Sequence, residues 1–287
     1  MKRNFYLFLV LWAFLFLTNC KKEEEQYRLT LATNLENAGV VIGSGDYDAG
    51  TEVSITATSN SGYIFKNWTH DTIIVSTNAN FTYTTPSKDI TLTANFLKKH
   101  TLTLQPNAAD GIDAFLYNIG PNTNYETHFD FAAIATTNSG TPAYARGLIK
   151  FDFSVLPSDA IIDSVTLTLY GYNSPANGTH RTISGSNACL FKRITENWDE
   201  STVTWNNQPN TTDQDAVSIP MSTSDTQSYT INITQAARYM IKNPSNNFGF
   251  KIQLVTESYY RQLVFASSDN SNSSIHPKIV IYYASLE

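Results

Sequence analysis

Apolar and polar residues alternate along most of the chain from residue 27 onward. A period of two is typical of β-strands that bury one face. In the first part of the chain, two such series are Val53, Ile55 and Ala57, and Leu92, Ala94 and Phe96. Short segments containing Gly interrupt the series at residues 43–45, 48–50 and 60–62, as turns between strands do. The pattern predicts a small β domain over residues 27–97.

Residues 101–287 show the same alternation in shorter and more numerous segments; residues 165–169, for example, alternate Val and Leu with Thr. We expect strands at residues 101–104, 145–153, 165–172, 188–194, 229–233, 248–256, 263–267 and 278–283. Many short strands separated by turns are typical of a β-sandwich, here of the jelly-roll kind. The intervening residues 98–100 are predicted as a linker that is too short to allow much freedom.

One segment of the second domain has helical rather than strand periodicity. Its apolar residues share one helix face: Ile233, Ala237, Met240 and Ile241. Asn232 or Thr234 can cap the start, and Asn243-Pro244 ends the segment. The expected fold class is therefore all-β, with a β-sandwich that contains one short helix.

The N-terminus has the pattern of a secretory signal peptide. Lys2 and Arg3 precede an unbroken apolar run of 13 residues, 5–17, which is shorter than the ~20 residues of a membrane-spanning helix. The run ends in Leu-Thr-Asn before Cys20, which resembles the lipobox of bacterial lipoproteins. The resemblance implies that residues 1–19 are removed and that the Cys20 thiol carries diacylglycerol, so that the membrane is a partner through the lipid anchor.

Residues 20–26 are then an acylated, charged tether. The run Lys-Lys-Glu-Glu-Glu at 21–25 is typical of a solvated spacer. It also resembles the export signal of Bacteroidetes surface lipoproteins. We therefore expect an outer-membrane lipoprotein that is exposed at the cell surface.

The composition excludes several other classes of protein. With 19 basic and 25 acidic residues, the chain has a net charge of −6, which excludes a basic nucleic-acid-binding protein. The only cysteines are Cys20 and Cys189, too few for a disulfide framework or a zinc cluster. We expect Cys189, in an alternating strand, to be a buried and unreactive thiol.

Two stretches of the first domain, AGTEVSITATSNSGYIFKNWT and NANFTYTTPSKDITLTANF, resemble a divergent internalin-B-type B-repeat. The resemblance covers nearly all of residues 27–97. It implies a small β-grasp-like domain with Phe65, Trp68, Phe81 and Phe96 in its core. Such repeats are usually spacers or adhesive stalks, and one copy would serve to lift the next domain.

The second domain contains ARGLIKFDFSVLPSDAIIDSVTLTLY, then RITENWDESTVTWNNQP, and finally LVFASSDNSNSSIHPKIVIYY. The series resembles the DNRLRE domain, also called carbohydrate-binding module family 96. Its most specific element is W-x-E-x-x-V-T-W-N-N-x-P, and members usually end in Arg-Pro where this chain has His276-Pro277. The resemblance implies a β-sandwich that binds polysaccharide, of alginate type in some members, and glycan-uptake proteins as partners.

A sugar site needs aromatic faces for stacking and planar polar groups for the hydroxyls, and an acidic sugar also needs Arg or Lys. The candidate binding residues are Arg146, Lys150, Arg181, Tyr259, Tyr260 and Arg261. Arg146 and Lys150 are four residues apart on one predicted strand, so they should share a face. Because residues 101–287 hold 10 basic and 16 acidic side chains, an acidic glycan requires a locally basic strip.

Two other functions stay open. In a polysaccharide lyase on the same sandwich, Arg261 would neutralise a carboxylate and Tyr260 would act as acid or base. The third function is a surface adhesin without a glycan ligand. We favour the binding module, because Tyr and Arg on strands more often lie on a plain surface than in a catalytic site. No cofactor is required, although the loop acids Asp110, Asp113 and Asp269 are of the type that holds a structural calcium.

Overall fold

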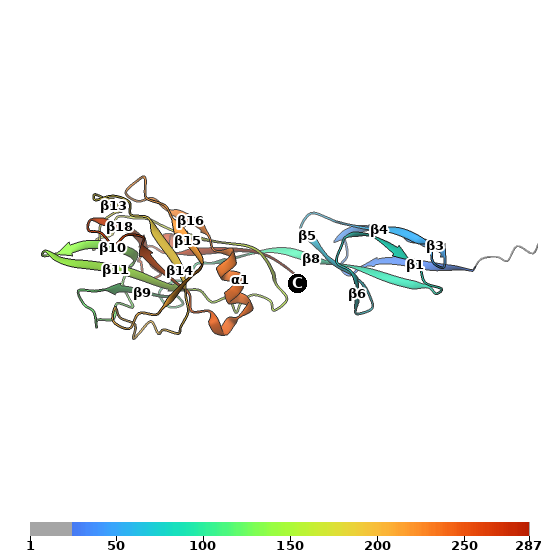
Figure 1. The fold of residues 1–287 in the computed structure, drawn as a ribbon, viewed down its shortest axis with the longest axis horizontal. Coiled ribbons are helices and arrows are strands. Elements are labelled where there is room, and N and C mark those ends of the chain that lie inside the picture. Colours follow the sequence, from blue (N-terminus) through green and yellow to red (C-terminus); the bar gives the residue numbers. More distant parts are fainter. Residues whose placement is uncertain (1–24, 287) are drawn as a thin grey trace, which may run out of the picture. The chain divides into compact units, whose positions relative to one another are not determined.

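The computed structural model describes residues 25–286. The predictions for the signal peptide 1–19, for Cys20 and for most of the 20–26 tether lie outside these residues. The described chain forms two compact units, one mainly from residues up to Asn95 and one mainly from Phe96 onward. Both units are built from strands, and one short α-helix is present among the described residues, so the predicted all-β class is confirmed (Figure 1).

The N-terminal unit contains seven strands and the first half of an eighth. They are β1 (Gln26–Thr33), β2 (Gly39–Ile42), β3 (Gly45–Asp48), β4 (Glu52–Ser59), β5 (Tyr63–His70), β6 (Ile73–Ser76), β7 (Asn80–Thr84) and β8 (Ile90–Leu104). Strand β1 pairs with β3 and, in parallel, with the start of β8, while β4 lies between β2 and β7. The alternating residues predicted from the sequence are buried here, and the fully buried ring of Trp68 lies 6.3 Å from Phe81.

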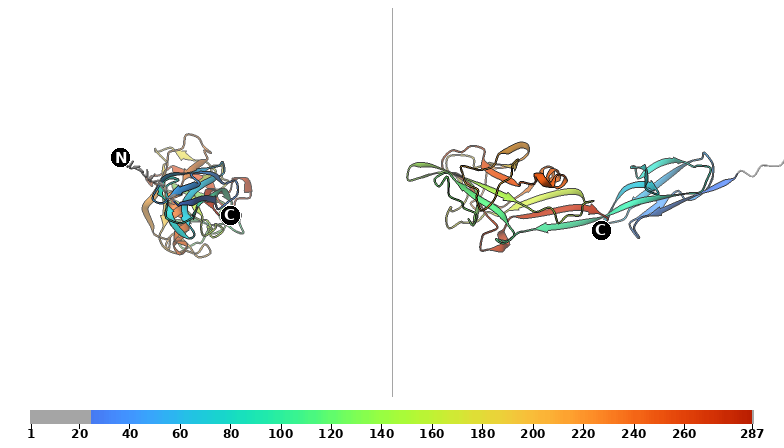
Figure 2. Two further views of the ribbon diagram at one scale, coloured as in Figure 1. Left: turned by 90° about the vertical axis from the view of Figure 1, so that its right-hand side faces the viewer. Right: turned by 90° about the horizontal axis from the view of Figure 1, so that it is seen from below.

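Strand β8 continues through the segment predicted as a linker. Residues 98–100 lie within β8, where Lys98 is opposite Ser285 and His100 is opposite Tyr283 of β19 (Lys278–Ser285). Figure 2 shows the second half of β8 beside β19. The backbone of the predicted linker is therefore hydrogen-bonded in a sheet.

Two sheets face each other in the C-terminal unit. One contains β16 (Tyr229–Asn232), β12 (Ile161–Leu169), β19 and the end of β8. The other follows the order β13 (Arg181–Thr182), β18 (Arg261–Ala266), β10 (Asp130–Asn138), β11 (Thr141–Lys150), β17 (Phe250–Leu254), β14 (Cys189–Ile194) and β15 (Thr211–Ile219), with β9 (Ile112–Tyr117) on β11. Apolar residues of both sheets form one core, among them Phe131, Leu167, Phe191, Phe250 and Ile281.

Glycine residues explain two local features of the second sheet, a tight turn and a close packing contact. Strands β10 and β11 form a hairpin whose two turn residues, Ser139 and Gly140, both have positive φ, which matches the right-handed twist of paired strands. Further along β11, a side chain on Gly147 would lie 2.7 Å from the ring of Phe131. The core therefore packs directly on the backbone of β11.

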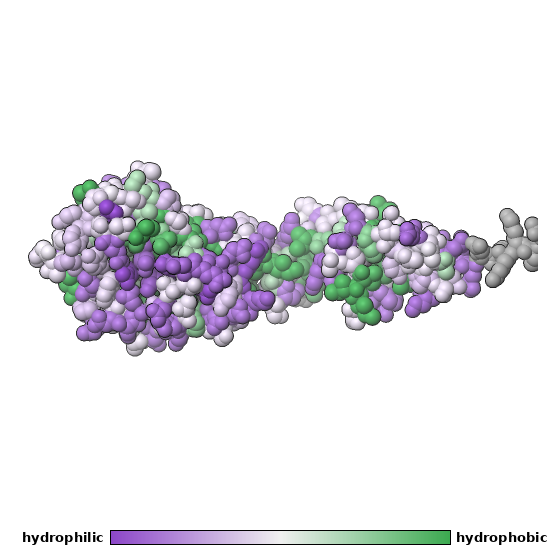
Figure 3. All heavy atoms as spheres, in the orientation of Figure 1, coloured by the Kyte–Doolittle hydropathy of each residue, from purple (hydrophilic) through white to green (hydrophobic). Residues whose placement is uncertain are grey.

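The helix α1 (Thr234–Lys242) lies where it was predicted and is followed by the 3-10 turn η1 (Pro244–Asn246). The N–H of Thr234 donates to Asn232 Oδ1 (2.9 Å), and Val165 N–H donates to the Thr234 hydroxyl (2.8 Å). Ala237 and Met240 are buried, whereas polar residues cover the outer side of the helix (Figure 3). Within residues 25–286, no helix is long and apolar enough to cross a membrane.

Four strands of this unit lie outside the predicted ranges, namely β9, β10, β13 and β15. Strand β10 consists largely of Ala and Thr, and β15 is a mostly polar strand at the edge of its sheet. Neither has the alternation of large apolar residues on which the prediction depended.

Candidate functional site

Three tyrosines, two exposed and one half-buried, form a cluster at one end of the second sheet. Tyr259 and Tyr260 lie on the loop 255–260 between β17 and β18 and are 39% and 44% exposed. The Tyr144 ring, from β11, stacks on Tyr259 with 6.3 Å between centroids and 28° between planes. A hydrogen bond with Tyr259 raises the pKa of Tyr144 above its ordinary value. We call Tyr144, Tyr259 and Tyr260 the tyrosine cluster.

The loop that carries the cluster is fixed by the segment Ile183-Ser184. Arg261 donates from Nε to the Ser184 hydroxyl (3.0 Å) and from Nη2 to the Ser184 carbonyl (2.6 Å), and that hydroxyl in turn donates to the Tyr259 carbonyl. Ile183 N–H donates to the Tyr260 carbonyl at 3.1 Å. These bonds fix the backbone from which the two exposed rings project.

The backbone of Tyr260 has a φ of 66°. The other described non-Gly residues with positive φ are Asn37, Asp71, Ser139 and Asp215. Short polar residues tolerate this conformation through local hydrogen bonds, whereas a bulky side chain is strained in it. The chain therefore keeps a large aromatic ring at a position that favours Gly.

Arg146 is fully engaged by other side chains. Its Nε and Nη2 each lie 2.9 Å from one carboxylate oxygen of Glu257, and its Nη1 donates to Gln208 Oε1 at 2.9 Å. The guanidinium also lies 4.6 Å from the centroid of the Trp205 ring. Arg146 thus ties β11 to the loop 255–260 and to the Trp205 segment, and its charge is already balanced.

Lys251 of β17 and Lys192 of β14 lie on the strands next to β11 and form a basic strip with Arg146. Lys251 is buried and donates to the Pro209 carbonyl at 2.9 Å, and Lys192 is paired with Asp213 at 2.6 Å. Burial, followed by the nearby charges of Arg146 and Lys192, lowers the pKa of Lys251 to about 8. Sequence reasoning missed Lys251, because a Lys that alternates with the apolar residues of a strand is expected on the exposed face.

The W-x-E-x-x-V-T-W-N-N-x-P element builds the corner that covers this strip. Trp198 Nε1 donates to the Phe248 carbonyl (2.7 Å), and Glu200 accepts the Asp113 N–H (2.7 Å). Val203 is buried, and Trp205 lies against Arg146. The element therefore acts on the tyrosine cluster indirectly, through Arg146 and Glu257.

The structure brings together four of the six predicted binding residues: Arg146, Tyr259, Tyr260 and Arg261 lie in or directly beside the loop 255–260. Arg181 is exposed on β13, opposite Gln262 of β18. Lys150 instead lines a groove beside α1, so Arg146 and Lys150 have different surroundings. In the described part of the chain, no carboxylate lies within ion-pair distance of Arg261 or Arg181.

The three predicted calcium ligands have different environments. Asp113 is buried and accepts the N–H (2.9 Å) and the hydroxyl (2.6 Å) of Ser268. Burial raises the pKa of Asp113, and the nearby charge of Asp269 raises it further. Asp110 lies on an exposed turn. Residues 25–286 contain no group of three or more His, Cys, Asp or Glu side chains that is arranged to hold a metal ion. The calcium site stays a prediction.

Comparison with protein families identifies both parts of the chain. The profile described as "Carbohydrate-binding module family 96" matches residues 102–283, and that described as "Divergent InlB B-repeat domain" matches residues 29–100. Both resemblances expected from the sequence are thereby confirmed, in the expected order. A search of curated proteins found no match.

Proposed function

Because the chain belongs to carbohydrate-binding module family 96, we propose that it is a cell-surface lipoprotein that binds an acidic polysaccharide through the tyrosine cluster and Arg261. Carbohydrate binding in general follows from the family. The observation that carries the proposed site is the pair of exposed rings, Tyr259 and Tyr260, on a loop fixed by hydrogen bonds. A loop whose backbone is already held in position loses little conformational entropy on binding.

The chemistry of the cluster fits an acidic sugar. The C–H faces of a sugar ring stack on tyrosine rings, and the hydroxyl groups of the tyrosines can bond to those of the sugar. Arg261 makes hydrogen bonds to uncharged Ser184 atoms, so its positive charge is available to a ligand carboxylate. Arg146 supports the loop rather than the ligand, because Glu257 already occupies two of its nitrogens.

The B-repeat domain serves, in this proposal, as the spacer between the lipid at Cys20 and the binding module. The support comes from the lipobox-like sequence and the acidic run behind it. Glycan-uptake proteins of the outer membrane are the expected partners. Changing Cys20→Ala should abolish cleavage of the precursor and labelling by a palmitate probe, and normal labelling of this variant would contradict the anchor.

The binding proposal is tested with the mature chain carrying Cys20→Ser, first on a polysaccharide array and then by titration with the glycan that binds. Tyr259→Ala and Arg261→Gln should each weaken binding, the latter by about tenfold to a hundredfold for a charge-assisted bond of ~1.5–3 kcal/mol. Tyr282→Ala removes a Tyr of similar exposure (46%) on β19 and is the matched control. Binding of an acidic glycan should also fall as salt rises.

Two outcomes would change the proposal. Binding that is independent of salt and of Arg261 would mean that a neutral glycan is recognised by stacking alone. Unchanged binding by Tyr259→Ala would remove the tyrosine cluster as the site. The same titration reports catalysis, because a lyase would generate unsaturated sugar ends during the measurement.

A further inference from the structure

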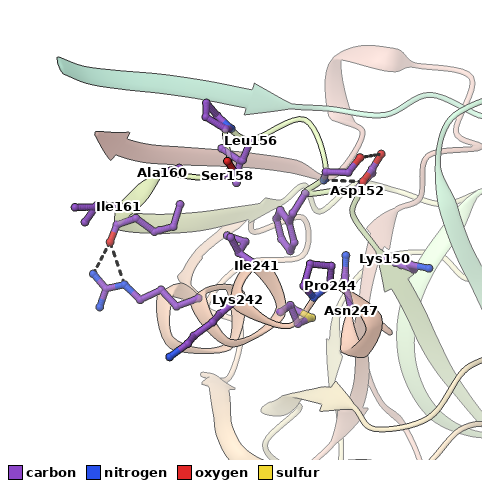
Figure 4. A pocket seen from close by; sticks show the side chains of 16 residues that line it. Lys150, Asp152, Leu156, Ser158, Ala160, Ile161, Ile241, Lys242, Pro244 and Asn247 are labelled. Atoms are coloured by element: carbon purple, nitrogen blue, oxygen red, sulfur yellow. Dashed lines mark hydrogen bonds between the residues drawn. The ribbon is translucent and has the colours of Figure 1, made fainter. Parts of the chain in front are cut away.

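A concave surface lies on the C-terminal unit, between the loop 151–160 and the segment formed by α1 and η1 (Figure 4). It is a groove of about 1030 Å³, close to the upper limit of typical ligand sites. Apolar side chains form much of its lining, among them Phe153, Leu156, Met240 and Ile241. It shares none of its lining residues with the tyrosine cluster.

The net charge of the residues that line the groove is opposite in sign to the net charge of the whole domain. Lys150, Arg238 and Lys242 line it together with a single acid, Asp152, which gives a net charge of +2 (3 − 1). Residues 101–287 as a whole carry 10 basic and 16 acidic side chains. The groove is therefore a locally basic strip of the kind that an anionic ligand requires.

None of these cations has a close ion-pair partner among the described residues, and Lys150 interacts with the Asp152 carboxylate only at longer range. Lys150 and Lys242 lie on opposite sides of the groove (Figure 4), and neither has an ion-pair partner in the part of the chain that the structure describes. Arg238 donates only to carbonyl groups, those of Ile162 (2.7 Å) and Asp163 (2.8 Å). Asp152 is held by Ser154, which donates to it from its N–H (2.8 Å) and its hydroxyl (2.9 Å).

Charge and apolar surface occur together in this groove. Asn247, one of its lining residues, is held in place by donating from Nδ2 to the Phe151 carbonyl at 2.8 Å. A bare inorganic anion would use the cations but not the apolar lining. A saccharide with anionic groups and apolar C–H faces would use both.

We propose that this groove is a second saccharide site of the module, which binds an anionic sugar independently of the tyrosine cluster. The proposal rests on the proposed function only in taking saccharides as the ligand. Two separate sites on one module would raise the avidity for a long polysaccharide without any change in the affinity for a single unit.

The test is isothermal titration calorimetry of the mature chain carrying Cys20→Ser with short oligosaccharides. An oligogalacturonide carries carboxylates, a sulfated galacto-oligosaccharide carries sulfates, and a maltotetraose is neutral. Lys150→Ala/Lys242→Ala removes two groove cations, and Lys66→Ala/Lys88→Ala removes two exposed lysines of the B-repeat domain as a control of equal charge.

We expect two anionic oligosaccharides per chain in the wild type and in the control. The groove variant should bind one, with the lost site weakened roughly tenfold or more. Tyr259→Ala should also bind one, by loss of the other site, and Lys242→Glu should repeat the effect of the groove variant. Whether the carboxylated or the sulfated ligand fills the groove identifies the anionic group.

Each contrary result has one meaning. Binding that is unchanged in the groove variant and lost with Tyr259→Ala overturns the groove and leaves the proposed function intact. Binding that is lost in the groove variant and unchanged with Tyr259→Ala keeps the groove and overturns the tyrosine site. Equal binding of the neutral ligand in the groove overturns the ionic argument, and no binding by any saccharide overturns both proposals.

Discussion

The strained backbone of Tyr260 allows a stability measurement that tests the geometry of the binding loop. At an ordinary strand position, a protein with Gly is less stable than one with Ala by ~0.5–1 kcal/mol, because Gly loses more conformational entropy on folding. With a φ of 66°, Tyr260 is in the left-handed region, where any residue with a Cβ is penalised by ~1–2 kcal/mol. The two effects oppose each other, so Tyr260→Gly should be more stable than Tyr260→Ala by about 0.5–1 kcal/mol.

The comparison of two variants removes the other contributions of the ring. Both lose the edge-to-face contact with Tyr259, at 6.4 Å between centroids, and the 3.3 Å contact of the hydroxyl with Thr137. Tyr259 provides the matched control, because it is adjacent, similarly exposed and has no positive φ. There the usual order should hold, with Tyr259→Ala more stable than Tyr259→Gly.

Urea unfolding followed by tryptophan fluorescence measures these differences as shifts in the midpoint at constant slope. Glycan titration of the same variants should show equal losses for Tyr260→Ala and Tyr260→Gly, about twofold to tenfold for one aromatic contact of ~0.5–1.5 kcal/mol. If Tyr260→Ala were more stable than Tyr260→Gly, the backbone at residue 260 would not be strained. Strain together with unchanged binding would refute the idea that the conformation is kept for the ligand.

Three further predictions concern the support of the site and the core. Arg146→Ala should lower the free energy of unfolding by about 1–3 kcal/mol, because it leaves Glu257 half-buried without its partner; Lys150→Ala should leave the urea midpoint unchanged. Burial raises the pKa of Asp113 to about 7, so the folded state binds more protons than the unfolded state between about pH 4 and 7, and stability falls as pH rises through that window. The free energy of unfolding of Asp113→Asn should therefore exceed that of wild type by up to about 4 kcal/mol at pH 8 and equal it at pH 4. Bound calcium would keep the carboxylate ionised in the folded state and abolish this difference. Burial also raises the pKa of the Cys189 thiol, so a water-soluble thiol reagent should modify it only in denaturant, and fast reaction in buffer would contradict its burial.

Local pattern determined much of the architecture. The alternation over residues 165–169 and 278–283 gives strands β12 and β19, and the apolar face of residues 233–241 gives the helix α1. Cys189 is buried as its position in an alternating strand predicts. These features follow from the sequence because burial of one face requires a fixed spacing of apolar residues, which is visible within a few positions.

The site depended on pairings between residues that are far apart in the chain. Arg146 and Glu257 are 111 residues apart and meet because the loop after β17 lies near β11, and this contact converts a predicted ligand-binding cation into a support. Lys150, four residues later on β11, lies beside Gly249 and lines a different surface, the groove next to the loop 151–160. The spacing along the strand determines that Arg146 and Lys150 project from the same face of β11. Only strand order and loop packing decide which of these charges has a partner and which remains free for a ligand.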